Sequence, residues 1–519
     1  MEIFHKMISA ALNLPEKQIS NTLGLLAEGA TIPFISRYRK EITGGLDEVQ
    51  IESIKTQYDK LSELAKRKET ILGTIGEQGK LTPELRQRID ATWDATALED
   101  IYLPYKPKRK TRAEAARQKG LEPLALLLMM QRENNLGSRI PAFVKGDVKD
   151  AEDALKGARD IIAEQVSEDE RARNAVRNLF ARQAVISADA YRRLLKPSIE
   201  TEFASLSKEQ ADDEAIRVFA ENLRQLLLAP PLGQKRVMGI DPGFRTGCKV
   251  VCLDAQGNLV HNENIYPHPP VDKKTEAASK LRKMIEAYKI EAIAIGNGTA
   301  SRETENFVTH QQFDRPVQVF VVSEQGASIY SASKTARDEF PDYDVTVRGA
   351  VSIARRLMDP LAELVKIDPK PIGVGQYQHD VDQTKLKKSL DQTVENCVNQ
   401  VGVNLNTASS HLLTYISGLG PQLAQNIVAY RAANGAFASR KELMKVPRMG
   451  AKAFEQCAGF LRIAGGENPL DNTAVHPESY GIVQQMAKDL SCTVPQLIAD
   501  KSLRTRIEME KYILSLIHI

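Results

Sequence analysis

Residues 235–254, KRVMGIDPGFRTGCKVVCLD, constrain the fold more than any other stretch of this chain. An apolar run ends in Asp241, turns through Pro242 and Gly243, and returns as a second apolar run over residues 248–253. Two such runs on either side of a Pro-Gly turn predict a strand, a tight turn and a second strand. The turn places a carboxylate at the end of a strand, where a fold can present an acid to a metal ion or a phosphate.

The segments that follow the hairpin alternate in type. They predict a strand at 259–265, a helix at 275–288, a strand at 292–296, a helix from Ser301, a strand at 317–322 and a helix at 347–358. Three sequential antiparallel strands followed by alternating helices and strands is the element order of the ribonuclease H-like fold. An actin-like ATPase would also need a second Gly-rich phosphate turn and an adenosine loop, and we find neither in the sequence.

Nuclease chemistry on this fold needs several carboxylates around two magnesium ions about 4 Å apart. Asp241 ends the first predicted strand, Glu324 follows the last strand, and Glu303 stands near the start of a helix. Asn297 occupies the position where the resolvases of this fold carry an acid, and the predicted last helix begins without one. The sequence therefore predicts a degenerate ribonuclease H-like domain that serves as a scaffold, with no catalytic residue assigned.

Two alternatives for Asp241 stay open. The first is a magnesium-dependent nuclease or Holliday-junction-resolvase-like enzyme that uses Asp241, Glu324 and Glu303, with Asp241 and Glu324 as the metal ligands. The second is structural: the Asp241 carboxylate caps its own turn through the backbone amides of Gly243 or Phe244.

The first 230 residues are predicted to be helical and contain two locally basic segments. Residues 37–40, RYRK, follow an apolar helix and suggest a helix-turn-helix recognition element, or else a helix with a solvated charged end. Residues 102–112, YLPYKPKRKTR, contain two prolines that break a helix, and the exposed loop so formed can neutralise phosphates or serve as a charged interdomain linker. The basic residues of this loop are Lys106, Lys108, Arg109, Lys110 and Arg112.

Two short segments near residue 430 predict helix-hairpin-helix units. In residues 415–424, YISGLGPQLA, Gly418 and Gly420 allow a tight turn, so the amides at the start of the next helix, near Gln422, can point at a phosphate oxygen. In residues 446–453, VPRMGAKA, Gly450 is kept while Arg448 stands in the place of Gly418, with Lys452 beside it. Two copies about 30 residues apart predict contact with a nucleic-acid backbone without sequence preference. The alternative is protein packing.

Composition excludes several classes of protein. The chain has 519 residues and a formal net charge of +3, so its total charge indicates no particular partner. Its five cysteines are scattered without a CxxC pair, which argues against disulfides and structural zinc. The sequence has no stretch of about 20 apolar residues and no signal peptide at its start, so we expect a cytoplasmic protein.

Five segments together resemble the Tex family of bacterial transcription accessory proteins, which bind RNA. Those segments are residues 29–48, 99–113, 239–249, 295–305 and 368–381. The resemblance implies a helical protein with a ribonuclease H-like domain of the YqgF type, tandem helix-hairpin-helix units and a C-terminal OB-fold. It also implies a likeness to a eukaryotic elongation factor that binds histones and RNA polymerase. Because the chain ends at residue 519 after a predicted helix at 504–513, we expect a family member truncated before the OB-fold.

The expected organisation has five parts. They are a helical region at 1–230, the ribonuclease H-like domain at 233–362, a connecting loop and helix at 363–395, tandem helix-hairpin-helix units at 396–470 and a helical segment at 471–519. The expected function is sequence-independent binding of RNA or DNA by a transcription accessory factor that is not an enzyme. Its expected partners are the nucleic acid and RNA polymerase or other transcription machinery, with no membrane, and we expect a monomer. No cofactor is expected, and magnesium belongs only to the nuclease alternative.

Overall fold

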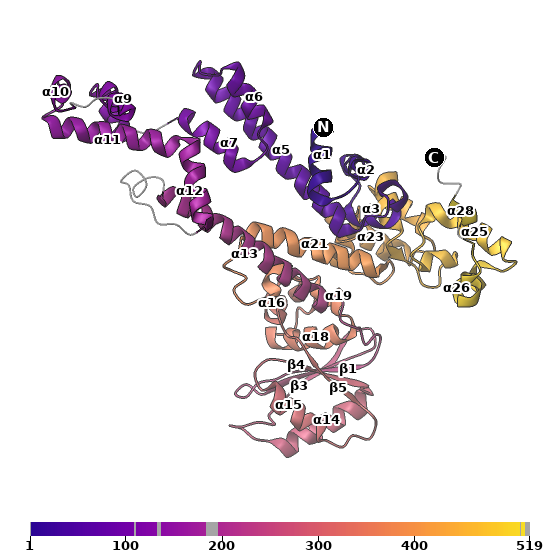
Figure 1. The fold of residues 1–519 in the computed structure, drawn as a ribbon. Coiled ribbons are helices and arrows are strands. Elements are labelled where there is room, and N and C mark those ends of the chain that lie inside the picture. Colours follow the sequence, from indigo (N-terminus) through magenta and orange to yellow (C-terminus); the bar gives the residue numbers. More distant parts are fainter. Residues whose placement is uncertain (1, 108–110, 132–135, 183–195, 509, 514–519) are drawn as a thin grey trace. The chain divides into compact units, whose positions relative to one another are not determined.

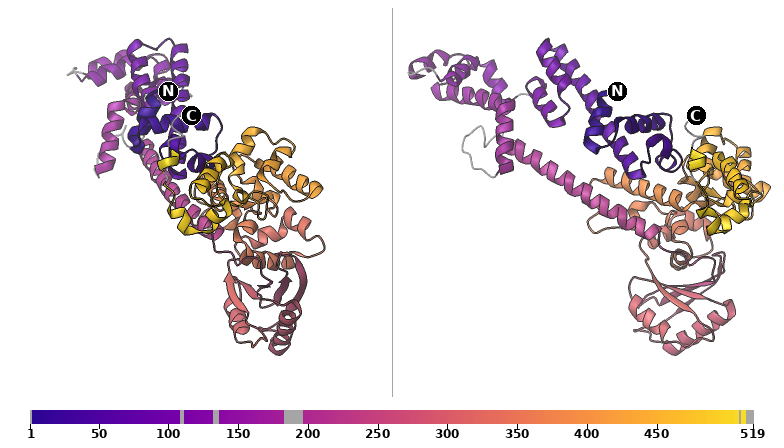
Figure 2. Two further views of the ribbon diagram at one scale, coloured as in Figure 1. Left: turned by 90° about the vertical axis from the view of Figure 1, so that its right-hand side faces the viewer. Right: turned by 45° about the vertical axis from the view of Figure 1, so that its right-hand side comes forward.

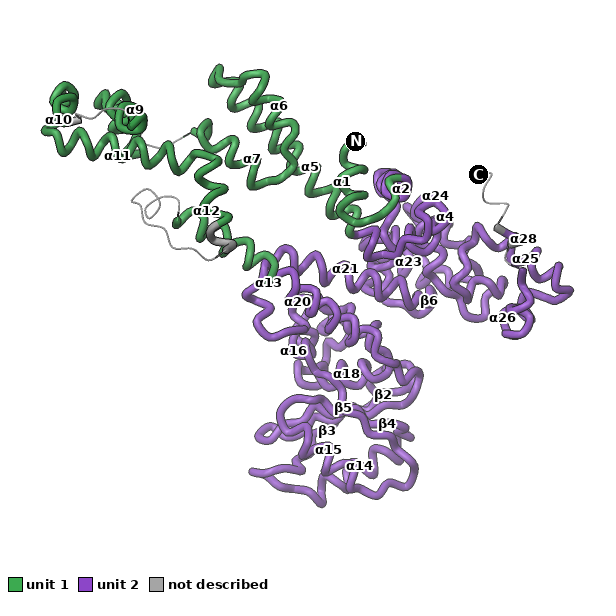
Figure 3. Tube along the Cα trace, viewed as in Figure 1, with its two compact units in different colours: residues 1–16, 53–211 green, residues 17–52, 212–519 purple. Residues whose placement is uncertain are grey.

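The computed structural model describes residues 2–107, 111–131, 136–182, 196–508 and 510–513. The chain divides into two compact units, one of residues 1–16 and 53–211 and the other of residues 17–52 and 212–519 (Figure 3). Helices dominate both units, as the sequence predicts, and the larger sheet lies in the second unit. None of the described helices combines the length and the apolar composition that crossing a bilayer requires.

The first unit is helical throughout its described part. Its helices include α1 (Glu2–Leu12), α5 (Glu48–Glu77), α6 (Pro83–Ala91), α7 (Ala95–Tyr102), α8 (Arg112–Gln118), α9 (Glu122–Met130), α11 (Ala151–Glu168) and α12 (Glu170–Arg182). Apolar residues at helical spacing in α5, α6 and α7, among them Ile71, Ile89 and Leu98, pack into a buried cluster. The long helix α13 (Lys196–Leu227) begins in this unit and ends in the other.

The ribonuclease H-like domain contains a five-stranded sheet, and its strands lie where the sequence predicts them. They are β1 (Val237–Asp241), β2 (Cys248–Leu253), β3 (Leu259–Ile265), β4 (Ala292–Gly296) and β5 (Gln318–Val322), in the order β3-β2-β1-β4-β5. β1 pairs antiparallel with β2 and parallel with β4. Helices α14 (Lys274–Tyr288) and α15 (Ser301–Thr309) cover one face, and α18 (Val345–Met358) covers the other (Figures 1 and 2).

Gly239 in the middle of β1 allows α18 to lie directly on the sheet. A side-chain carbon at Gly239 would lie 2.6 Å from the backbone oxygen of Ala350 in α18, a distance that no real contact permits. The absence of a side chain therefore lets the first half of α18 approach the strand that ends in Asp241.

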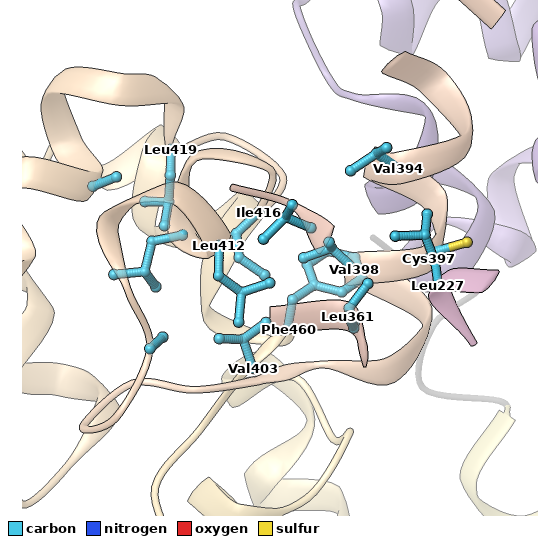
Figure 4. Packing of buried hydrophobic residues seen from close by; sticks show 14 of the residues in the cluster. Leu227, Leu361, Val394, Cys397, Val398, Val403, Leu412, Ile416, Leu419 and Phe460 are labelled. Carbon is cyan, nitrogen blue, oxygen red and sulfur yellow. The ribbon is translucent and has the colours of Figure 1, made fainter. Parts of the chain in front are cut away.

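The rest of the second unit is helical and shares one large apolar core. Its helices include α2 (Glu16–Ala27), α3 (Ile32–Tyr38), α19 (Pro360–Leu364), α21 (Gln383–Val401), α22 (Ser410–Thr414), α23 (Gly420–Asn434) and α24 (Ala451–Ala458). Figure 4 shows Leu227 at the end of α13, Val394 and Val398 on α21, and Leu412 on α22 within this core. The hairpin region is therefore packed into the unit through apolar side chains.

The C-terminal region differs from its prediction at one place. The sequence predicts a single helix at 504–513, but α27 (Lys501–Thr505) ends at Thr505 and α28 (Glu510–Ile513) begins five residues later. Asp500 caps α27 by accepting a hydrogen bond from the Ser502 amide at 2.7 Å. The cap starts this helix three residues before the predicted start, and the prediction of one continuous helix is wrong because residues 506–508 are not helical.

Candidate functional site

Two carboxylates lie at the ends of neighbouring elements of the sheet domain. Asp241 ends β1, and Glu324 follows β5 with its carboxylate over Gly296 and Gly298 at the end of β4. A side-chain carbon at Gly349 in α18 would lie 3.7 Å from Oδ2 of Asp241. Gly349 therefore occupies the place beside Asp241 where a further acid on this helix would complete a metal site.

The electrostatics at Asp241 fit a carboxylate without a close counterion. Its pKa is raised from 3.8 to about 6, chiefly by burial and then by the negative charge of Glu324, while Lys249 acts in the opposite direction. The predicted cap is not formed, because none of the described residues donates a hydrogen bond to this carboxylate. The capping interpretation of Asp241 is therefore wrong.

The other candidate ligands do not complete a metal site. Oδ1 of Asn297 accepts a hydrogen bond from the backbone amide of Glu324 at 3.0 Å, which uses the side-chain oxygen within the loop. Glu303 is exposed in the first turn of α15 and lines a surface hollow with Asn297 and Gly298. Across the described ranges, no three His, Cys, Asp or Glu side chains come together in a group that could hold a metal ion.

The two hairpin turns have nearly the same geometry. The Leu419 amide donates to the Ile416 oxygen in the first turn, and the Met449 amide donates to the Val446 oxygen in the second, each at 3.0 Å. Gly418 has a φ of +77° in the first turn, and Arg448, at the matching position, has a φ of +68°. The backbone is therefore left-handed at both positions, although Arg448 carries a side chain that disfavours this conformation.

The helices that follow these turns begin with open amides. Neither α23 nor α24 has a side-chain cap hydrogen bond at its N-terminus. A side-chain carbon at Gly420 or Gly450 would meet nothing within 4 Å, so both glycines border open space. Arg448 is exposed beside the start of α24. Free amides, the positive end of a helix dipole and a cation together suit a phosphate group.

Other predicted hairpin residues contact the protein. Gly418 packs against α24, because a side-chain carbon there would lie 2.7 Å from Cβ of Gln456. Nζ of Lys452 donates to the backbone oxygen of Glu28. Gln422 is exposed and donates to Asn426 at 3.1 Å. Gly418 and Lys452 therefore contact other parts of the protein, as the packing alternative expects. The other four residues face open space or solvent: Gly420, Gln422, Arg448 and Gly450.

The sequence gives no signal for Asn426, which joins the two hairpins. Its side-chain amide donates to the backbone oxygen of Pro447 at 2.8 Å. This bond ties the first hairpin helix to the second turn, so it links α23 to the turn before α24.

The two basic segments of the N-terminal region have different environments. Arg37 donates to the backbone oxygen of Asn399 at 2.8 Å, and Arg39 pairs with Glu478 at 3.1 Å. Arg37 and Arg39 are thus bonded to other parts of the protein, which argues against a recognition element and against a simply solvated helix end at these two residues, whereas Lys40 is exposed. In the basic loop, Lys106 is exposed and Arg112 begins α8. Lys108, Arg109 and Lys110 lie outside the described residues.

The fold and these sites define a class of protein: a mainly helical, multidomain chain with a ribonuclease H-like domain and paired helix-hairpin-helix units. Family models match in four places. They are the Tex-like protein N-terminal domain at 2–76, the Tex protein YqgF-like domain at 235–358, the helix-hairpin-helix motif at 398–462 and an HHH domain at 468–518. The chain belongs to the Tex family.

Similar curated proteins come from several bacteria and from animals. The transcriptional accessory protein Tex of Neisseria gonorrhoeae is 42% identical, over 96% of this chain and 76% of that protein. Protein YhgF of Escherichia coli is 43% identical, over 96% of this chain and 76% of that protein. The human S1 RNA-binding domain-containing protein 1 is 31% identical, over 94% of this chain and 64% of that protein.

Proposed function

We propose that this chain is a transcription accessory factor that binds the phosphate backbone of RNA or DNA with little dependence on sequence. The observation that carries the proposal is Arg448, an exposed arginine held at a φ of +68° beside the uncapped start of α24. Glycine would adopt this conformation without strain, so keeping arginine there costs folding free energy. A phosphate contact from the guanidinium is a functional reason for that cost.

The two hairpins act together in this proposal. The helix starts at α23 and α24 each offer backbone amides, which contact phosphates and read no base. Arg448 adds a cation, and the basic loop with Lys106 and Arg112 adds charge elsewhere on the chain. The name of the human relative refers to RNA binding, which favours testing RNA first. RNA polymerase or other transcription machinery is the expected protein partner.

The ribonuclease H-like domain acts as a scaffold in this proposal. In the part of the chain that the structure describes, the carboxylates of Asp241 and Glu324 have no third acid beside them, and Gly349 stands where one would be needed. Two-metal hydrolysis requires carboxylates that hold both ions, and a single pair does not supply them. Nuclease chemistry at Asp241, Glu324 and Glu303 remains the competing proposal, and the magnesium experiment described in the Discussion distinguishes the two.

We expect Gly450→Ala to weaken nucleic-acid binding without destabilising the protein. Gly450 has an ordinary negative φ, and an added methyl group would meet nothing within 4 Å, so the fold accommodates alanine. A phosphate bound close to the backbone amides would collide with that methyl group. The measurement is fluorescence anisotropy with labelled single-stranded RNA and duplex DNA, at several salt concentrations.

The matched control for this change is Gly73→Ala in α5. A methyl group at Gly73 also meets nothing within 4 Å, and the residue lies outside the hairpins. The proposal expects a several-fold loss of affinity for Gly450→Ala and none for Gly73→Ala. Equal affinities for wild type and Gly450→Ala would argue that no phosphate approaches this helix start.

We expect Arg448→Gly to separate binding from stability. Glycine relieves the strain of the left-handed backbone in the folded state, which stabilises the protein. Glycine also increases the conformational entropy of the unfolded chain, which destabilises it. Because these effects oppose each other, the free energy of unfolding should stay within about 1 kcal/mol of wild type. Affinity should fall, and the slope of log K against log salt should become shallower by about 0.7 to 0.9 as one phosphate contact is lost. Anisotropy titrations across salt concentrations measure this slope. An unchanged slope would remove Arg448 from the interface.

A further inference from the structure

Residues 28–39, which include the loop before α3 and that helix, are bonded to the second hairpin helix, α24. They belong to the same compact unit as the hairpins. Nζ of Lys452 donates to the backbone oxygen of Glu28, and Nε2 of Gln456 donates to that of Gly29 at 2.9 Å. Gln456 is only 5% exposed. The loop therefore contacts α24 through two side chains of that helix.

Arg39, which follows α3, makes a further bond to the same helix. Its guanidinium pairs with Glu455 on α24 and with Glu478 at 3.1 Å. It also lies over the ring of Phe34, with 4.6 Å between Cζ and the ring centroid. The residues of α24 that this segment contacts, at positions 452, 455 and 456, are spaced by three and four, so they share one face of the helix.

Thr31 connects the same segment to the first hairpin. Its Oγ1 hydrogen-bonds to Oγ of Ser417, which is 1% exposed and directly precedes Gly418 in the turn. Thr31 is the N-cap residue of α3, where a threonine hydroxyl usually accepts a hydrogen bond from a helix amide. In this helix no such cap hydrogen bond forms. The hydroxyl therefore serves the contact with the first hairpin and not the stability of its own helix.

One short loop thus contacts both hairpins. Glu28 and Gly29 accept hydrogen bonds from the second hairpin helix, and Thr31 bonds to the first hairpin turn. These contacts leave the two helix starts uncovered, because a side-chain carbon at Gly420 or Gly450 would meet nothing within 4 Å. The segment is therefore placed to orient the two helix starts without occupying either of them.

We propose that residues 28–39 hold the two helix starts in a fixed relative position, so that one nucleic-acid strand contacts both at once, with Thr31 and Arg39 as positioning residues. This inference rests on the proposed function, since it concerns how the same two sites act together. Two phosphate contacts held on one rigid body form a bivalent site, in which the second contact is an intramolecular step. If the two helices moved independently, ordering them would cost part of that gain.

The test compares a long oligouridylate with the dinucleotide UpU, whose single phosphate can contact only one helix start. Fluorescence anisotropy measures binding of the first probe and ligand-observed NMR that of the second, both with the whole chain. We expect the double variant Thr31→Val, Arg39→Gln to lose about tenfold in affinity for the long probe and to bind UpU as wild type does. Arg39→Lys in place of Arg39→Gln can still pair with Glu455 or Glu478, so it should restore most of the affinity.

The matched control makes the same two chemical changes elsewhere in the unit, Thr275→Val and Arg217→Gln. Thr275 is exposed on α14, and Arg217 pairs with Glu214 on α13, where the two side chains are 69% and 65% exposed. This control should bind both probes as wild type does. Wild-type affinity of the Thr31→Val, Arg39→Gln variant for the long probe, or an equal loss for both probes, would overturn this inference alone. Absence of wild-type binding to the long probe would overturn the proposed function as well.

Discussion

Asp241→Asn should make the ribonuclease H-like domain more stable at neutral pH, by about 1–3 kcal/mol. The pKa of Asp241 is raised from 3.8 to about 6, chiefly by burial and then by the negative charge of Glu324, so the folded state disfavours its charged form. The free energy of unfolding contributed by this group is highest below pH 3.8, where both states are protonated, and falls as the pH rises to about 6. The gain of the variant should therefore vanish in acid and be complete above pH 6.

The readout has to be local, because the sequence has a single tryptophan, Trp93, and it lies in the other unit. Hydrogen exchange of peptides that cover β1 measures the stability of the sheet domain. Asp254→Asn is the matched control with the opposite sign. The Asp254 carboxylate accepts hydrogen bonds from the amides of Gln256 and Asn258, which lower its pKa, so its loss should destabilise the domain at pH 7.

The effect of added magnesium on stability and cleavage distinguishes the scaffold proposal from the nuclease proposal for the ribonuclease H-like domain. If the carboxylates of Asp241 and Glu324 bound magnesium, adding the ion would stabilise wild type and leave Asp241→Asn unaffected. We expect no such difference and no cleavage of branched DNA or RNA. Magnesium-dependent cleavage that is lost in Asp241→Asn would overturn the scaffold proposal in favour of nuclease chemistry.

Asp100→Asn should destabilise the first unit by about 3–5 kcal/mol. Asp100 is 4% exposed and accepts hydrogen bonds from Arg173 at 2.7 Å and from Arg177 at 2.5 and 3.0 Å. The charge of Asp100 therefore holds α7 to α12. The amide would leave two largely buried guanidinium groups sharing the single carboxylate of Glu202, so one positive charge would lose its counter-charge, which is the costly outcome when one partner of a buried ion pair is removed.

The adjacent residue provides a matched control. Glu99 pairs with Arg67 at 2.7 Å on the surface, where the side chains are 39% and 45% exposed, and Glu99→Gln should cost less than about 1 kcal/mol. Fluorescence of Trp93, which packs against Phe4 in this unit, follows both unfolding transitions in denaturant. Equal midpoints for the two variants would show that the network around Asp100 contributes little.

The sequence predicts the sheet domain closely because its signals are local. Apolar runs bounded by turn residues located all five strands, and the order of elements identified the fold. Helix ends depend on single residues, such as the Asp500 cap that starts α27 at Lys501, and the predicted helix at 504–513 is in fact two helices separated after Thr505. The same local reasoning aligned Arg448 with Gly418, because the two residues occupy equivalent positions in the two hairpin turns.

The sequence by itself determined the family, the fold of the central domain and the place of Asp241 at the end of a strand, because these follow from residues close together in the chain. Only the tertiary structure decided what each side chain meets. It placed Gly349 beside Asp241 and joined Lys452 to the Glu28 oxygen. Each of these involves partners from distant segments, and burial and charge act through space, so no local pattern contains them.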